Sequence, residues 1–302
     1  MATGIQAVGR LETGQDDCTF CSPLSIDEQT QKSPKLGEVH VWSARLALRQ
    51  GSGQVSTQNK YEVFHGSLST DERKRAENFV HERDRNRYII ARGILRELLG
   101  HYLGMAPEQV CFSYGLNGKP YLAESSAGSG LEFNLSHAAD SAVYAFANRT
   151  QVGIDIEPLS KGLAWRQLAP IVFSAREQGK LAEFPEDEKT EAFLRGWTRK
   201  EALVKGCGVG LSLDLNAFDV PLGRLENPSP VRLSNKPADL WWLCPIDPIA
   251  DFVAALTVNG APPLRIVVDR YIDWPMPAGP TATIIQRSVG AMPTAQSEIN
   301  PL

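Results

Sequence analysis

The chain has 302 residues, 42% of them hydrophobic and 22% charged, which is the composition of a folded globular protein and not of a disordered one. Its 31 basic and 35 acidic residues give a formal net charge of −4, so the overall charge provides no attraction to nucleic acid or to a membrane surface. No apolar run approaches the ~20 residues needed to span a bilayer. The N-terminus also lacks a signal-peptide pattern, so we expect a cytoplasmic protein.

The first 36 residues are rich in Gly, Ser, Thr, Gln and Asp and show no hydrophobic periodicity, so residues 1–36 are expected to be a flexible N-terminal tail. Within them Cys18 and Cys21 form a CxxC. No second CxxC or pair of histidines is present to complete a tetrahedral zinc site, and the setting is not the βα unit of a redox CxxC. We therefore favour neither a metal nor a redox role for this pair.

The next segment, residues 37–150, reads as a first α+β unit. Its expected elements are a strand at 38–46, helices at 68–79 and 87–100, a turn at NGKP (117–120), and strands at 131–137 and 141–147. Ser69 or Thr70 can cap the first helix, which carries Glu72 in its first turn, and Gly100 is expected to end the second helix.

A second unit, residues 151–273, repeats this order. A strand is expected at 152–158, helices at 173–184 (opening at Ser174) and 191–206, and strands at 241–246 and 251–258. Residues 274–302 resemble the N-terminal segment in composition and are expected to be a flexible C-terminal tail.

The two units correspond in spacing as well as in order. Glu97 follows Glu72 by 25 residues, and Glu201 follows Glu177 by 24 residues. The sequence therefore predicts an α+β fold of two halves related by a pseudo-twofold and joined near residues 149–151, with a ligand in the cleft between them. Chance similarity of two α+β stretches is the alternative.

VGIDIEP (152–158) is the most informative short segment. Asp155 and Glu157 are two residues apart on a strand, so both carboxylates project from one face of it. A cation between them would relieve their repulsion, and hard oxygen ligands suit Mg²⁺. An edge strand with a solvated acidic face explains the pattern equally well.

The helix ending in KEALVKG adds a third acid and a base. Glu201 and Lys205 lie four residues apart on one helical face, which is also the spacing of an ordinary surface ion pair. If that face looks into the cleft, Glu201 meets Asp155 and Glu157. Such a set can bind a metal-phosphate, accept the proton of a nucleophile and stabilise a leaving oxygen.

Cations are concentrated in the first half. Arg75 and Arg92 lie in its basic helical region, and Lys119 and the Ser136–His137 pair follow in or near turns. Arginine forks suit phosphate oxygens, although most of these basic residues can simply pair with neighbouring acids.

Together these motifs resemble the 4′-phosphopantetheinyl transferases, in the two-halved type that serves polyketide, nonribosomal-peptide and fatty-acid carrier proteins. The resemblance rests on VGIDIEP followed by WTRKEALVKGCGVGLSLDL, with NGKPYL and FNLSHAADSAVYAFA upstream, and it extends from about Val41 to Leu256.

The resemblance implies transfer of phosphopantetheine from coenzyme A to a serine of an apo acyl or peptidyl carrier protein, with release of 3′,5′-ADP. It implies Mg²⁺ on Asp155, Glu157 and Glu201, with Glu201 and Lys205 catalytic. Coenzyme A would contact Arg75, Arg92, Lys119, Pro120, Ser136 and His137. Glu72 stands where some relatives carry a phosphate-binding lysine, which leaves the residue for the 3′-phosphate open.

A monomer that binds neither nucleic acid nor membrane is the expected form, since one chain holds both halves. The alternatives are a non-catalytic coenzyme A or carrier-protein binding module with the same fold, and another Mg²⁺-dependent phosphotransferase. The complete acid set disfavours the first, and the absence of GxxxxGK[ST] or GxGxxG in the sequence disfavours the second. The sequence does not identify the carrier protein or its pathway.

Overall fold

The computed structural model describes residues 33–46, 57–123, 128–159, 163–210, 213–234, 239–247, 249–271 and 283–285. Most of the expected N-terminal tail, including Cys18 and Cys21, lies outside these residues. The same holds for most of the expected C-terminal tail.

The first half contains β1 (Glu38–Arg45), α1 (Thr57–Ser67), α2 (Thr70–Glu77), α3 (Glu82–Leu103), the 3₁₀ turn η1 (Pro107–Gln109), β2 (Phe112–Tyr114), β3 (Pro120–Leu122), β4 (Leu131–Ala138) and β5 (Ser141–Asn148). The second half contains β6 (Val152–Pro158), α5 (Trp165–Val172), α6 (Ala175–Glu183), α7 (Lys189–Cys207), the 3₁₀ turn η3 (Leu215–Ala217), β7 (Ser229–Arg232), β8 (Leu240–Cys244) and β9 (Phe252–Asn259). The last described strands are β10 (Arg265–Tyr271) and β11 (Thr283–Ile285).

Local capping signals set the ends of the helices, as the sequence predicts. Ser69 caps α2 and Ser174 caps α6, each in a capping box whose acidic partner is three residues on. Gly208 ends α7 in the left-handed conformation, with φ of 70°. The expected end of α3 at Gly100 is three residues early, because Gly104, with φ of 68°, supplies the left-handed cap.

Two sheets form the centre of the fold. One has the order β11-β10-β1-β5-β4 and the other has the order β6-β9-β8-β7. In each half the first strand pairs antiparallel with the last strand of its hairpin, β1 with β5 and β6 with β9. The repeated order confirms an α+β fold built from two similar halves.

The C-terminal segment departs from the expected division of the chain. β10 was expected to belong to the second half, yet it pairs parallel with β1 in the sheet of the first half. β11 lies within the segment expected to be a flexible tail, and it pairs antiparallel with β10. The chain after residue 264 therefore returns to the first half and binds it.

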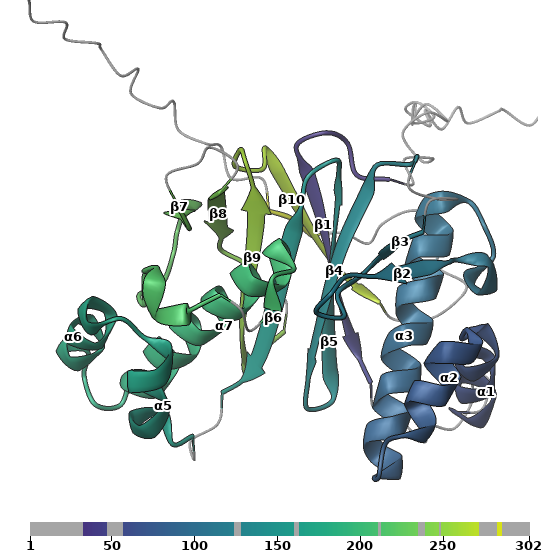
Figure 1. Cartoon of the computed structure of the whole chain (residues 1–302), viewed down its shortest axis with the longest axis horizontal. Helices are drawn as coiled ribbons and strands as arrows, with labels where there is room; N and C mark the ends of the chain where they lie inside the picture. The colour runs from purple at the N-terminus through teal and green to yellow at the C-terminus, as the bar shows by residue number, and fades with distance from the viewer. Residues whose placement is uncertain are drawn as a thin grey trace, which may run out of the picture. The chain divides into compact units, whose positions relative to one another are not determined.

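The sheets lie face to face with helices outside them (Figure 1). Val41 and Val143 from one sheet pack with Ile154, Ile156 and Leu256 from the other. Helix α3 covers the outer face of the first sheet, and α7 covers that of the second. This arrangement brings β4 beside β6, where the Ile154 amide donates to Oδ1 of Asn134 at 2.8 Å.

Each half also contains a buried ion pair at the same place. Arg96 Nη2 lies 2.7 Å from Oε2 of Glu72, and Lys200 Nζ lies 2.7 Å from Oε2 of Glu177. The two acids are the capping-box residues of α2 and α6. The two cations also donate to carbonyl oxygens at the following 3₁₀ turns: Pro107 and Val110 in the first half, Leu215 and Phe218 in the second. These matched contacts support duplication over chance similarity.

Candidate active site

Helix α7 lies unusually close to β6, and glycine makes this possible. A Cβ on Gly153 would lie 1.9 Å from the carbonyl oxygen of Ala202 and 2.6 Å from the amide nitrogen of Gly206. Thr257 donates to the carbonyl oxygens of both Gly153 and Ala202, at 3.3 and 3.2 Å. Because Asp155 and Glu157 follow Gly153 on the same strand face, this packing places them under the helix that carries Glu201 and Lys205.

Asp155 is the centre of this contact. It is buried, and its Oδ1 accepts hydrogen bonds from Ser136 at 2.8 Å and from the ammonium of Lys205 at 2.5 Å. Lys205 also donates to Oγ of Ser136 at 2.8 Å. Strands β4 and β6 and helix α7 thus meet at one point. The structure brings together Asp155, Ser136 and Lys205, which the sequence analysis assigns to metal binding, coenzyme A binding and catalysis respectively.

Glu157 and Glu201 share the electrostatic environment of Asp155. Burial raises the pKa of both glutamates, and the charge of Asp155 raises the pKa of each further. Trp197 donates to Oε1 of Glu157 at 3.3 Å. The site therefore concentrates negative charge that Lys205 only partly offsets.

The donors fit a divalent cation. Oδ2 of Asp155 is buried and has no hydrogen-bond partner among the described residues. A hard cation would satisfy this oxygen and relieve the repulsion between the carboxylates. In the part of the chain that the structure describes, no three His, Cys, Asp or Glu side chains converge closely enough to form a metal cage. A cation here would take some of its ligands from substrate phosphate or water, as Mg²⁺ commonly does.

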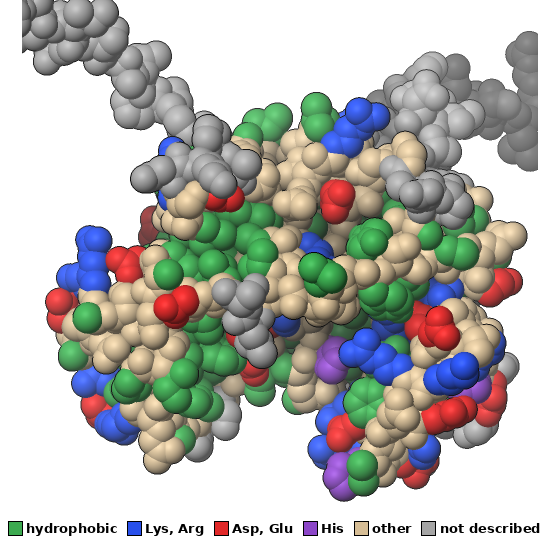
Figure 2. All heavy atoms as spheres, in the orientation of Figure 1, with side chains coloured by type: hydrophobic (Ala, Val, Ile, Leu, Met, Phe, Trp, Pro, Cys, Tyr) green, Lys and Arg blue, Asp and Glu red, His purple; other side chains and the backbone are tan. Residues whose placement is uncertain are grey.

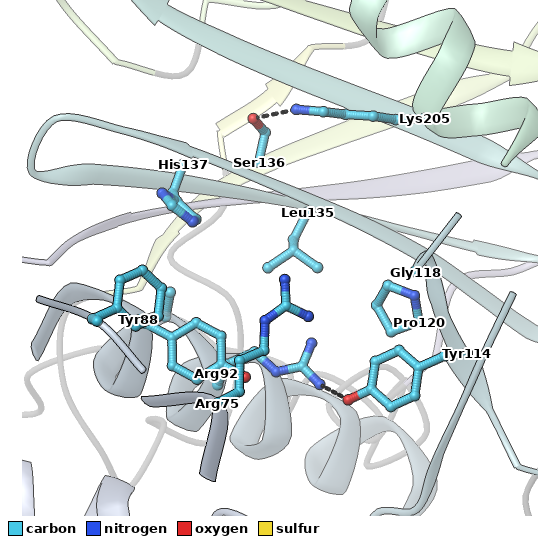
Figure 3. A pocket seen from close by; sticks show the side chains of 12 residues that line it. Arg75, Tyr88, Arg92, Tyr114, Gly118, Pro120, Leu135, Ser136, His137 and Lys205 are labelled. Carbon is cyan, nitrogen blue, oxygen red and sulfur yellow. Dashed lines mark hydrogen bonds between the residues drawn. The ribbon is translucent and has the colours of Figure 1, made fainter. Parts of the chain in front are cut away.

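A cavity of 260 Å³ opens beside Ser136 and Lys205, the two hydrogen-bond donors to Asp155, and residues of both halves line it (Figure 3). Its walls are formed by Arg75, Phe79, Tyr88, Ala91, Arg92, Tyr114, Gly118, Pro120, Leu135, Ser136, His137 and Lys205. In Figure 2 basic and histidine side chains gather over the helices of the first half, beside the hollow between the halves. The cavity therefore offers both flat apolar surface and cations.

The two arginines of the cavity are held differently. Arg92 donates to Glu72 at 2.7 Å and to the Tyr114 hydroxyl at 3.0 Å, so its guanidinium is fixed. Arg75 is exposed and lies 5.8 Å from the ring centre of Tyr88, a cation–π distance. Glu72 is buried beneath Arg92, so it takes no place on the cavity wall.

His137 stands in the cavity wall at the end of β4. Desolvation lowers its pKa, and the charges of Lys205 and Arg87 lower it further. The following turn contains Ala139 in a left-handed conformation, with φ of 49°, and Arg87 holds the turn by donating to Asp140 at 2.8 Å. This turn fixes the direction of the strand end that carries His137.

Lys119 is the expected site residue that the structure places elsewhere. Pro120 lines the cavity, but Lys119 does not, and its ammonium donates to the Gly206 carbonyl oxygen at 2.6 Å. Conversely, Tyr88 and Tyr114 line the cavity although no sequence motif indicates them. Tyr114 reaches the cavity only because the β2–β3 hairpin packs near α3, and no local sequence pattern predicts this packing.

Both halves of the chain match known proteins in sequence. A family model described as 4′-phosphopantetheinyl transferase superfamily matches residues 151–257, and one for the N-terminal part of such transferases matches residues 55–149. The 4′-phosphopantetheinyl transferase HetI of Nostoc sp. is 39% identical over 223 residues, which are 74% of this chain and 88% of that protein. The chain belongs to the 4′-phosphopantetheinyl transferase superfamily.

Other members of the superfamily match over shorter stretches of the chain. The 4′-phosphopantetheinyl transferase Sfp of Bacillus subtilis is 30% identical over 55% of this chain and 71% of its own. AcpT of Escherichia coli is 41% identical over 37% of this chain and 55% of its own. This phosphopantetheinyl transferase is thus an enzyme that transfers phosphopantetheine to carrier proteins. Among its described residues, no helix is long and apolar enough to cross a bilayer.

Proposed function

We propose that the cavity binds coenzyme A and that Asp155, Glu201 and Lys205 act on its pyrophosphate. The observation that carries this proposal is the buried Asp155 beside a cavity lined by arginine. One of its oxygens accepts from Lys205, and the other has no hydrogen-bond partner among the described residues. A negatively charged ligand with flat and apolar parts suits such a cavity.

Different residues of the cavity would contact different parts of coenzyme A. Arg75, Arg92 and His137 provide donors for phosphate oxygens, while Tyr88 and Pro120 provide apolar surface. Ser136 and Lys205 stand next to Asp155, so the pyrophosphate would lie against them. Mg²⁺, held by Asp155 with Glu157 and Glu201, would neutralise phosphate charge there and strengthen the electrophile.

The proposed transfer is a single displacement at phosphorus. The carrier serine oxygen forms a bond to the phosphorus that bears the pantetheine arm, and the bond from this phosphorus to the bridging oxygen breaks. Glu201 accepts the serine proton, and Lys205 stabilises the charge on the departing 3′,5′-ADP.

The decisive test is mass spectrometry of an apo carrier protein after incubation with the enzyme, coenzyme A and Mg²⁺. We expect the carrier to gain one phosphopantetheine group and 3′,5′-ADP to appear in equal amount. A carrier with its acceptor serine replaced by alanine is the matched control. EDTA should stop the reaction, and transfer at an undiminished rate in EDTA would rule out the role of the metal.

We also propose that the enzyme acts as a cytoplasmic monomer. Both halves lie in one chain and already cover each other's sheet face. The described cysteines, Cys111, Cys207 and Cys244, are free, as expected in a reducing compartment. Light scattering on the purified chain tests the monomer, and a stable dimer that loses activity on dilution would contradict it.

A further inference from the structure

The turn that contains NGKP contacts both the cavity and helix α7. Gly118 and Pro120 line the cavity, whereas Asn117 and Lys119 contact the end of α7. Within the turn, the Gly115 amide donates to the Lys119 carbonyl oxygen at 2.9 Å, which holds these residues in a compact loop. One short loop of the first half therefore touches both the coenzyme A cavity and the catalytic helix of the second half.

The contacts to α7 fall on carbonyl groups that the helix itself leaves free. The last carbonyl groups of a helix have no intrahelical partner and carry partial negative charge. The Lys119 ammonium donates to the Gly206 carbonyl oxygen at 2.6 Å, and Nδ2 of Asn117 donates to the Gly208 carbonyl oxygen at 3.1 Å. A lysine charge at this position stabilises the helix end as well as holding it.

Glycines on the helix side allow this approach. A Cβ on Gly208 would lie 3.3 Å from the Lys119 side chain, and one on Gly210 would lie 2.7 Å from the Asn117 side chain. Both glycines have positive φ, 70° and 58°, where other residues are strained. The glycine-rich turn after α7 is thus shaped to receive the loop.

The residue held by Lys119 is the direct neighbour of a catalytic one. Gly206 follows Lys205, whose ammonium lies 2.5 Å from Asp155. A shift of the last turn of α7 would move Lys205 and change its distance from Asp155. Misplacement of a catalytic group by about 1 Å can cost roughly 10²-fold in rate.

We propose that Lys119 and Asn117 are positioning residues that hold the end of α7 and couple its catalytic face to the coenzyme A cavity. This inference rests on the proposed function, but it replaces the role in coenzyme A binding that the sequence suggests for Lys119. Lys119 acts through Gly206 and Lys205, and its ammonium does not touch the substrate.

The test compares Lys119→Met, which keeps the aliphatic stem, with Lys119→Arg and with the loop control Leu116→Ala. Leu116 is fully exposed on the same turn, so its loss disturbs no contact with α7. We expect Lys119→Met to lower kcat by roughly 10-fold or more while the Kd for coenzyme A changes less than about 3-fold. Lys119→Arg should restore most of kcat, and Leu116→Ala should match the wild type.

Hydrogen exchange supplies a readout that does not depend on turnover. Amides of residues 203–208 should exchange faster in Lys119→Met than in the wild type, and coenzyme A should protect them less. A 10-fold rise in Kd with unchanged kcat and unchanged exchange would make Lys119 a coenzyme A ligand and overturn the proposal. Wild-type kinetics and exchange in Lys119→Met would overturn it as well.

If Lys119→Met does not fold, Asn117→Ala tests whether the loop holds the end of α7. Its side-chain bond is exposed, so its loss should leave the fold intact while it accelerates exchange at residues 206–210 and lowers kcat. No change in either quantity would contradict the proposal. Failure of the wild-type enzyme to modify any carrier would instead contradict the proposed function, and the exchange measurements would still report on the loop contact.

Discussion

The ammonium of Lys205 lies 2.5 Å from Oδ1 of Asp155, while Oδ2 of the same buried carboxylate has no partner among the described residues. One oxygen is thus engaged by the protein and the other is available to a cation. Asp155 therefore has two roles: one oxygen holds Lys205, and the other is available as a metal ligand.

Asp155→Asn should be nearly inactive because an amide oxygen binds Mg²⁺ more weakly than a carboxylate does. Raising the Mg²⁺ concentration should restore part of the rate, measured as holo-carrier formation in a Mg²⁺ titration. The exposed Asp187 provides the control variant Asp187→Asn, which should behave as the wild type. A folded Asp155→Asn enzyme with normal rate at low Mg²⁺ would exclude Asp155 as a metal ligand.

Glu201→Gln tests the general base separately from the metal. The substitution keeps size and helix propensity but removes the charge that accepts the serine proton, so kcat should fall by roughly 10²-fold or more. High Mg²⁺ should restore much less of this rate than it restores in Asp155→Asn. Glu188→Gln, at the exposed start of the same helix, is the matched control. Near-normal turnover by a folded Glu201→Gln enzyme would show that Glu201 is not the general base.

The sequence predicted these site residues because they belong to compact motifs with local signals. Helices α2, α6 and α7 were also predictable from their caps and glycines. β10 was not predicted in the first half, because its partner β1 is more than 200 residues away and strand pairing leaves no local mark. Tyr114 was not predicted either, because it reaches Arg92 only through the packing of the β2–β3 hairpin near α3. The turn motif identified Lys119, but a motif cannot show that the side chain points to Gly206.

Glu72 shows how a motif comparison can mislead. In the sequence it occupies a place linked to phosphate binding, yet in the structure it caps α2 and binds Arg92 and Arg96. Glu72→Gln leaves two buried arginines without a charged partner among the described residues, so the free energy of unfolding should fall by about 3–5 kcal/mol. Urea denaturation measures this loss, and Glu77→Gln on the exposed face of α2 is the control. An unchanged unfolding free energy would contradict the structural role.

Acid should reproduce the effect of this substitution. Burial alone would raise the pKa of Glu72, but Arg92 and Arg96 outweigh it and the net pKa is lowered below 4.5. A carboxyl with a lowered pKa in the folded state stabilises the protein above its unfolded pKa and loses this contribution as pH falls through the folded pKa. Wild-type stability should therefore drop more steeply below pH ~4.5 than that of Glu72→Gln. Parallel pH profiles would contradict this account.

Removal of β10 should prevent folding of the first half. The strand pairs with β1, and Tyr271 donates to the buried Glu97 of α3. A chain ended at Gly260 should lack cooperative unfolding by circular dichroism, because β1 loses its neighbour and Ile266 no longer covers the core. A chain ended at residue 286 keeps both strands and should unfold as the full chain does. Cooperative unfolding of the shorter chain would show that β10 is dispensable.

Gly153→Ala tests whether the close approach of α7 creates the active site. The new Cβ would lie 1.9 Å from the Ala202 carbonyl oxygen, which is a backbone atom, so the helix itself must move. Overpacking of this kind costs typically 1–3 kcal/mol of stability, and the displaced Glu201 and Lys205 should lower kcat by about 10-fold or more. Gly179→Ala in α6 is the control, since its Cβ meets nothing within 4 Å. It should raise stability by about 0.5–1 kcal/mol with normal activity. Thermal melts and carrier-modification kinetics on both variants provide the comparison, and wild-type kinetics in Gly153→Ala would show that the site tolerates a shifted helix.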